Sequence, residues 1–241
     1  MAEFEFNSTI VRYALPLAEK NGFEVILTQP LDGKDTRLDY RIEIAIKNKV
    51  NALVSIHADY NNDRSVRGFW NFYWFECEKS KKLANIWIKY AKNMLNTICR
   101  GSIESKPYTW TNFYMVRNPI ANIHHNFPAI LCECGFMSNT YDLSLLLSDN
   151  YRKLVAEVIV RSLCEFFGKE YKEDDTSLIW KKELGLETLD NLYKSGIINT
   201  PEIHKKDIEN NWFIFVIADS LNKKIDKIND KLDKISKILN G

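Results

Sequence analysis

The 241-residue chain lacks an excess of charge of one sign, since 33 basic residues oppose 32 acidic ones. Clustered Lys and Arg of the kind that bind nucleic acid are therefore not predicted. No apolar run approaches the roughly 18 residues of a membrane span, and the N-terminus lacks a basic segment followed by an apolar one. We expect no nucleic-acid partner, no membrane span, and synthesis in the cytoplasm without a visible signal peptide.

The chain also lacks a regular cysteine framework. Its cysteines are Cys77, Cys99, Cys132, Cys134 and Cys164. An odd number without regular spacing argues against complete disulfide pairing, which indicates a chain that is reduced when it is synthesised.

Aromatic residues are plentiful, and they are densest from Phe69 to Phe75. Their alternation predicts a strand with Trp70, Phe72 and Trp74 on one face. Packing in the core is the preferred interpretation of this strand. A platform on which a sugar stacks is the alternative.

An apolar segment from Asn51 onward ends at His57, which predicts a buried strand with an imidazole at its carboxyl end. Ligand-binding and catalytic groups of open α/β sheets gather just beyond the carboxyl ends of strands. Imidazole is a common zinc ligand and also a common structural group. The segment thus predicts either a metal ligand or a hydrogen-bonded histidine that ends a strand.

A second apolar segment, starting at Pro128, carries Glu133 close to a glycine. Glutamate is rarely buried unless it is paired or lies beside a metal ion. Strand alternation puts Glu133 on the face opposite Cys132 and Cys134, which we interpret as core residues. A Cys-x-Cys metal site is the alternative for these two thiols.

Strand patterns alternate with helical patterns along the first two thirds of the chain. Expected helices cover residues 7–20, 37–49, 80–98 and 150–167, and expected strands cover 23–28, the segment ending at His57, 69–75, a short stretch near Tyr114, and the Glu133 segment. This order predicts an α/β fold with a mainly parallel twisted sheet flanked by helices.

Two of these segments resemble the motifs of one enzyme family. Ser55 to Asp59 looks like the sequence Ser-Ile-His-Ala-Asn, and Glu133 to Asn139 looks like Glu-x-Gly-Phe-x-Ser-Asn. Both belong, in this order, to the zinc-dependent N-acetylmuramoyl-L-alanine amidases of amidase type 3, which cleave bacterial peptidoglycan. With minor matches between and around them, the resemblance covers about residues 1–168.

The resemblance implies a Zn²⁺ cofactor and a set of site residues. His57 would be one zinc ligand and Glu3, four residues before Asn7, another, with Glu5 as the fallback. Without the resemblance, Glu3 would be read as a favourable charge at a helix N-terminus. Glu133 would be the catalytic base rather than a ligand.

In this family a further zinc-binding histidine follows an opening strand, and Met1 falls after that point. We expect the strand and its histidine to be encoded upstream. His124 or His125 is the alternative third ligand, although nothing in their spacing requires it. Catalytic zinc normally has three protein ligands and a water molecule.

The function that the resemblance implies is zinc-dependent hydrolysis of the amide bond between N-acetylmuramic acid and the L-alanine of the stem peptide. The protein would act at the bacterial cell wall, as a phage or prophage endolysin. The first alternative is a catalytically incomplete, oligomeric wall-binding protein derived from the same fold. The second is a different zinc peptidase that cleaves the stem peptide.

Composition changes divide the chain into four parts. We expect a catalytic domain at residues 1–168, a polar linker at 169–177, a small helical module at 178–212 and a coiled-coil helix at 213–241. The last part has apolar residues at alternating spacings of four and three, namely Leu221, Ile225, Ile228, Leu232, Ile235 and Leu239. This pattern predicts a homo-oligomer that associates through the C-terminal helix.

Overall fold

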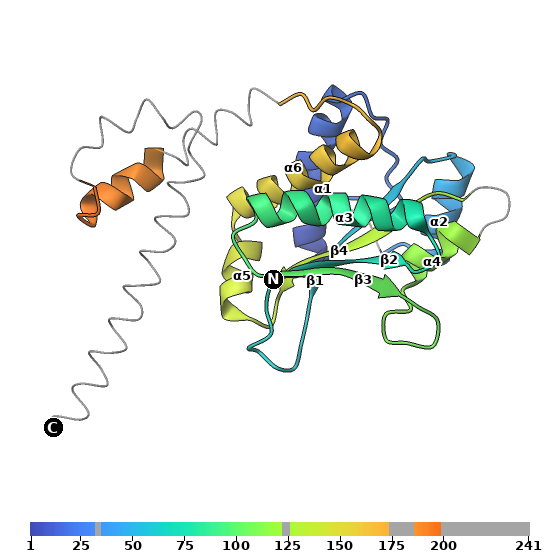
Figure 1. Cartoon of the computed structure of the whole chain (residues 1–241), viewed down its shortest axis with the longest axis horizontal. Helices are drawn as coiled ribbons and strands as arrows, with labels where there is room; N and C mark the ends of the chain where they lie inside the picture. Colours follow the sequence, from blue (N-terminus) through green and yellow to red (C-terminus); the bar gives the residue numbers. More distant parts are fainter. Residues whose placement is uncertain (32–34, 122–125, 174–185, 199–241) are drawn as a thin grey trace. The chain divides into compact units, whose positions relative to one another are not determined.

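The computed structural model of the chain describes residues 1–31, 35–121, 126–173 and 186–198 (Figure 1). The chain divides into two units, Met1–Lys172 and Glu173–Gly241. The elements of the first unit are α1 (Glu3–Lys20), α2 (Leu38–Lys47), β1 (Leu53–Asp59), β2 (Phe69–Trp74), α3 (Glu78–Met94), β3 (Cys99–Ser105), α4 (Tyr114–Ala121), β4 (Ala129–Phe136), α5 (Thr140–Leu146) and α6 (Asp149–Phe166). This unit is an α/β domain, as the alternation of patterns predicts.

The described strands form one four-stranded sheet in the order β1-β4-β2-β3. β1 and β4 run parallel, β2 and β3 run parallel, and the central pair β2 and β4 runs antiparallel. The sheet is therefore mixed rather than mainly parallel. The direction of each strand depends on the path of the connections between elements, which the apolar patterns do not encode.

Helices α1, α3 and α6 pack on one face of the sheet and on one another (Figure 1). On this face Phe69 of β2 meets Trp87 of α3, with ring centroids 5.8 Å apart. Asn71, two residues further along β2, donates from Nδ2 to the Ala84 carbonyl of α3 at 2.8 Å. Cys132 of β4 lies opposite Asn71 and is fully buried. The cysteines of β4 thus face a packed layer of helices.

Helices α2 and α4 lie on the other face, where a second apolar cluster fills the space. Its buried members are Ile42, Ala45, Leu53, Phe72, Met115, Val116, Phe127, Ala129 and Leu131. Phe72 lies opposite Leu131 in the ladder between β2 and β4. Glu133 is two residues beyond Leu131 and so lies on the same face, past the part of the sheet that this cluster covers.

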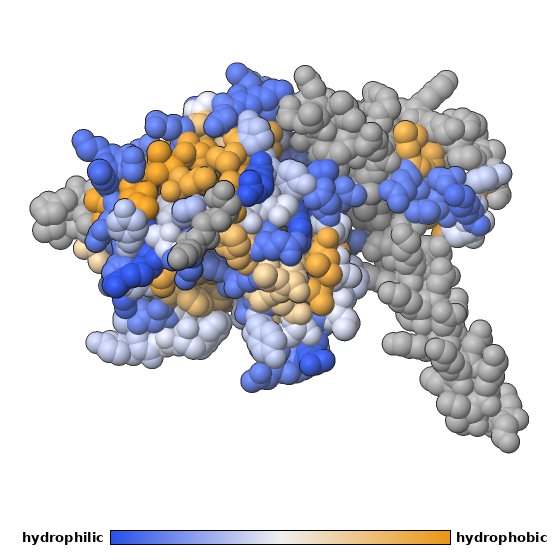
Figure 2. All heavy atoms as spheres, turned by 180° about the vertical axis from the view of Figure 1, so that it is seen from behind, coloured by the Kyte–Doolittle hydropathy of each residue, from blue (hydrophilic) through white to orange (hydrophobic). Residues whose placement is uncertain are grey.

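Three predicted elements differ from the structure. Residues 23–28 form no strand, and β1 pairs with β4 alone among the described strands. A strand is defined by its partner, so an apolar segment without one stays irregular. Val25 and Leu27 are exposed there, and Figure 2 shows apolar side chains gathered on the rear of the molecule.

The other differences concern the region between β2 and β4. The stretch near Tyr114 begins helix α4 instead of a strand, and the predicted long helix ends at Met94, so that residues 99–105 form the edge strand β3. Strand β3 is polar and only partly buried, so its alternation is too weak to predict a strand. Gly68 accommodates its neighbour: a Cβ built there would lie 2.3 Å from the Ile98 carbonyl oxygen.

In the second unit, residues 186–194 are helical and fall inside the small helical module expected at 178–212. Residues 199–212 of that module and the coiled-coil segment 213–241 lie outside the described residues. The four-part domain division and the oligomer therefore stay predictions. No helix among the described residues is long and apolar enough to cross a membrane.

Candidate active site

Three side chains from different strands form a row across the sheet. His57 of β1 lies opposite Glu133 of β4, and Glu133 lies opposite Trp70 of β2. Side chains at directly paired positions share one face of the sheet and lie close together. The row is therefore a property of strand register, and it brings His57 and Glu133 to one place from positions 76 residues apart in the sequence.

Helix α1 adds a carboxylate to this row. Glu3 is its first residue, and Glu3 Oε1 lies 2.8 Å from His57 Nδ1. The same oxygen accepts from the Ala58 backbone N–H at 3.3 Å and from Asn7 Nδ2 at 3.5 Å. Partial burial acts to raise the pKa of Glu3, but its contacts with His57, Ala58 and Asn7 outweigh burial and lower the pKa. Glu3 is thus held as a carboxylate against the imidazole.

The second ring nitrogen of His57 also has a partner, because Nε2 lies 2.8 Å from the Ser55 hydroxyl. A neutral imidazole with its proton on Nδ1 satisfies both contacts: Nδ1 donates to Glu3, and the hydroxyl of Ser55 donates to Nε2. These two contacts fix the plane of the ring. The imidazole keeps 28% of its side-chain surface exposed, so it stays accessible from solvent.

Glu133 is placed where its charge is costly. Its Oε2 atom is shut off from solvent and has no hydrogen-bond partner among the described residues. Burial raises the pKa of Glu133 well above its usual range, and the carboxylates of Asp59 and Glu3 raise it further. A carboxyl group with a raised pKa and an unbonded oxygen is suited to take up and return a proton, as a general acid or base must.

Asp59 is a site residue that the sequence did not single out. Burial raises the pKa of Asp59, while the Trp70 indole, whose Nε1 donates to Oδ2 at 3.0 Å, and the charge of Arg100 lower it. A departure from the family motif could have drawn attention to it, because this position carries Asn in the motif that Ser55–Asp59 resembles. Asp59 adds negative charge beside Glu133.

The fallback ligand Glu5 lies elsewhere. Its Oε1 forms an ion pair with Arg152 Nη2 of α6 at 3.2 Å. The structure therefore brings Glu3, and not Glu5, to His57. Glu3 and Glu5 are two residues apart, about half a helical turn, so their side chains leave opposite sides of α1.

The donors at this site suit a zinc ion in type, since zinc in proteins is bound by imidazole and carboxylate groups. Glu3 and His57 would provide two of the three protein ligands that a catalytic zinc ion normally has. Among the described residues no group of three or more His, Cys, Asp and Glu is arranged to hold a metal ion. His124 and His125 lie outside the described residues, and Cys132 and Cys134 are free thiols buried on the opposite face.

The turn after β4 is held by short polar side chains. Asn139 Oδ1 accepts from the backbone N–H groups of Tyr141 and Asp142, which caps helix α5, and Asn139 Nδ2 donates to the Arg64 carbonyl at 2.7 Å. The Ser138 hydroxyl accepts from the Asn61 backbone N–H at 3.0 Å. These residues connect the turn to the segment that follows β1, which fixes the loops beside the site.

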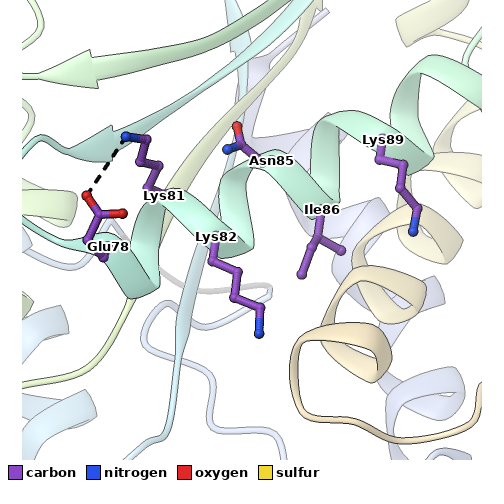
Figure 3. Close-up of a pocket in the computed structure, with 6 residues that line it drawn as sticks. All are labelled: Glu78, Lys81, Lys82, Asn85, Ile86 and Lys89. Carbon is purple, nitrogen blue, oxygen red and sulfur yellow. Dashed lines mark ion pairs between the residues drawn. The ribbon is translucent and has the colours of Figure 1, made fainter.

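Helix α3 carries a hollow on its surface (Figure 3). It is lined by Glu78, Lys81, Lys82, Asn85, Ile86 and Lys89. Lys81 pairs with Glu78 at 3.8 Å and Lys89 with Glu165 at 2.5 Å, so two of its three cations are already matched. Because α3 covers the sheet face opposite Glu133, the hollow is not part of the candidate active site.

The fold and the site together define an α/β domain with an imidazole–carboxylate centre at strand ends, an arrangement typical of metal-dependent hydrolases. The family model described as N-acetylmuramoyl-L-alanine amidase matches residues 1–165. The chain belongs to this family.

Relatives and solved structures agree with this assignment. A probable cell wall amidase, LytH of Staphylococcus saprophyticus, is 28% identical over 153 residues, which cover 64% of this chain and 46% of LytH. An uncharacterized cell wall amidase of Bacillus anthracis is 27% identical over 169 residues, 66% of this chain and 30% of the relative. The chain thus spans less than half the length of these two relatives.

Among solved structures, the catalytic domain of CwlV, an N-acetylmuramoyl-L-alanine amidase from Bacillus (Paenibacillus) polymyxa, superposes with a TM-score of 0.62 at 26% identity. The match covers 70% of this chain and 87% of that domain. AmiC2, an amidase of Nostoc punctiforme, gives a TM-score of 0.59 at 25% identity and covers 69% of this chain and 85% of that one. The mixed sheet with flanking helices is therefore the fold of amidase catalytic domains.

Proposed function

We propose that this protein is a zinc-dependent peptidoglycan amidase that cleaves the bond between the lactyl group of N-acetylmuramic acid and the L-alanine of the stem peptide. The observation that carries the proposal is the placement of the Glu3–His57 pair beside the desolvated carboxyl group of Glu133. Family membership supports the choice of bond. Glu3 and His57 are two of the zinc ligands in this proposal, and the third donor lies outside the described residues.

Glu133 handles the proton. Its ionised carboxylate takes the proton of the attacking water, and the resulting acid gives it to the amine nitrogen that leaves, which restores the carboxylate. The raised pKa of Glu133 suits this return step, because the group holds its proton until the amine needs it. Bound zinc would supply a lowered pKa for the attacking water and polarisation of the scissile carbonyl.

The proposal is tested by digesting purified peptidoglycan and analysing the products. An amidase releases free stem peptides with an N-terminal alanine and leaves glycan strands with free lactyl carboxyl groups. Cleavage inside the stem peptide, with alanine still attached to the lactyl group, would instead identify a peptidase. Zinc content of the same preparation, with removal by a chelator and restoration by added Zn²⁺, tests the cofactor.

The alternative is a wall-binding protein that has lost catalysis. It is favoured by one observation, namely that only two of three zinc ligands come together among the described residues. That protein would bind peptidoglycan sacculi in a pull-down, contain no zinc and release no new amino termini. Zinc near one equivalent with new amino termini would reject it.

The proposal has two finer parts, an endolysin role and homo-oligomerisation. The endolysin role rests on the family resemblance alone. It is tested by adding the purified protein to bacterial cells from outside and measuring whether the cells lyse rapidly. Homo-oligomerisation rests on the heptad-like spacing of the C-terminal segment. Light scattering of the full chain against a chain ending at residue 212 would show a loss of mass per particle if this segment associates.

A further inference from the structure

The row that contains Glu133 continues into an aromatic surface. Trp70, the neighbour of Glu133 on β2, lies with its ring centroid 5.7 Å from that of Trp110. Trp110 belongs to the segment between β3 and α4, and its ring also stands 5.7 Å from that of Phe72 in an edge-on arrangement. The rings of Phe72 and Trp70 thus pack against one side of the Trp110 ring.

Trp110 nevertheless stays 69% exposed. Large apolar surface left in water is unfavourable, and its burial by a ligand is a ready source of binding energy. Arg100 of β3 adds a cation at one side, with its guanidinium carbon 4.7 Å from the centroid of the Trp70 ring. We call Trp70 and Trp110 the tryptophan surface.

We propose that the tryptophan surface binds the glycan side of the substrate, with Trp110 stacking on a pyranose ring. This inference rests on the proposed function. It adds the orientation of the substrate, because it states which strands the glycan side of the scissile amide lies over. Pyranose rings present a face of C–H groups that packs against an indole, whereas the flexible, charged stem peptide offers no such flat apolar face.

The distances fit a muramoyl unit. Trp70 lies on the strand next to Glu133, and neighbouring strands are about 5 Å apart. The ring centroid of Trp110 lies a further 5.7 Å from that of Trp70. A sugar joined to the scissile amide through the short lactyl group reaches that distance. The stem peptide then extends to the other side of Glu133, over β1 and the start of α1.

The contact of Trp70 with Asp59 connects the surface to the catalytic row. The indole donates from Nε1 to Asp59 Oδ2 at 3.0 Å, which fixes the ring plane of Trp70. The ring of Trp110 packs against this fixed ring in a tilted arrangement, with 38° between the two ring planes. Its role is substrate positioning, since Trp110 itself touches none of the groups that handle the proton.

The test compares Trp110→Ala, Trp110→Phe and Tyr108→Ala, the last being a matched control because Tyr108 is in the same loop and fully exposed. Binding of an N-acetylglucosamine tetrasaccharide, which carries no muramoyl–alanine bond, is measured by calorimetry with each change made in the Glu133→Gln background. We expect Trp110→Ala to weaken binding roughly tenfold, Trp110→Phe to retain most of it, and Tyr108→Ala to change it less than twofold.

Turnover is then measured on two substrates, a disaccharide stem peptide and the same peptide carrying only a lactyl group. Trp110→Ala should raise KM for the disaccharide substrate without lowering kcat, and should leave the lactyl-peptide unchanged. Equal losses on both substrates, or tetrasaccharide binding that ignores Trp110, would overturn the inference. If the wild-type chain binds the tetrasaccharide through Trp110 but cleaves neither substrate, the proposed function fails and the saccharide surface stands.

Discussion

The two faces of strand β4 differ within three residues. Cys132 and Cys134 are fully buried against the layer of helices α1, α3 and α6, and their side chains form part of its packing. Glu133, between them, points to the other face, where its Oε2 is dry and has no partner among the described residues. Because side chains alternate along the strand, one face of β4 contributes to the packed core and the other carries the carboxyl group of the candidate site. The packing of the cysteine face stabilises the fold and offsets the unfavourable burial of the Glu133 carboxyl group.

The sharpest test of this contrast is Glu133→Gln. The amide keeps the shape of the side chain but cannot take or return a proton, so hydrolysis should fall by about 10²–10⁴-fold. The fold should persist, because the change removes a costly buried charge and leaves the apolar face untouched. Release of free amino termini from peptidoglycan measures activity, and circular dichroism with thermal melting measures folding. Activity near wild type would reject Glu133 as the base.

A second test uses the two glutamates at the start of α1. Glu3→Gln removes the carboxylate that meets His57, and zinc affinity should fall by at least roughly 10–100-fold. Glu5→Gln is the matched control, because Glu5 is bound to Arg152 in a partly exposed ion pair worth about 1 kcal/mol or less. Competition with a chromogenic chelator measures the affinity. Equal effects of both changes would contradict the assignment of Glu3.

The packed face is tested by Cys132→Ser. The new hydroxyl would be buried where the native thiol is fully enclosed, at a cost of about 1–3 kcal/mol. For a chain of this size the melting temperature should fall by roughly 2–4 °C per kcal/mol. Activity per folded molecule should not change. The same substitution at the partly exposed Cys99 is the control and should lower the melting temperature less.

How far the sequence could predict the site depends on the kind of information. The strands that carry His57 and Glu133 were predicted and are confirmed, because each is an apolar run long enough to be unambiguous. Whether the two residues lie in one row depends on the register between β1 and β4. That register cannot be read directly from the sequence of a single chain. Only the family resemblance placed the two residues together.

The misses have the same origin. Residues 23–28 have a strand-like composition, yet a strand also needs a neighbour, and the prediction was wrong there. Strand β3 is the reverse case, since its polar sequence gives no strand pattern but it pairs with β2 at the sheet edge. Asp59 and Trp110 were missed as site residues because their importance lies in what surrounds them in space.

The smallest predicted effect is on the pH dependence of stability, measured on metal-free protein in the presence of a chelator. Burial holds the pKa of Glu133 above its ordinary value of 4.5, so the folded state binds the proton more tightly than the unfolded chain. The stability that this gives is complete below the unfolded pKa and is lost as pH rises through the folded pKa. Glu133→Gln has no such loss. Its melting temperature should therefore exceed that of the wild type above the folded pKa of Glu133, by roughly 2–4 °C for each kcal/mol, and the gap should close as pH falls toward the ordinary value of 4.5. A difference in melting temperature that does not depend on pH would mean that burial does not raise the pKa of Glu133 in the folded protein.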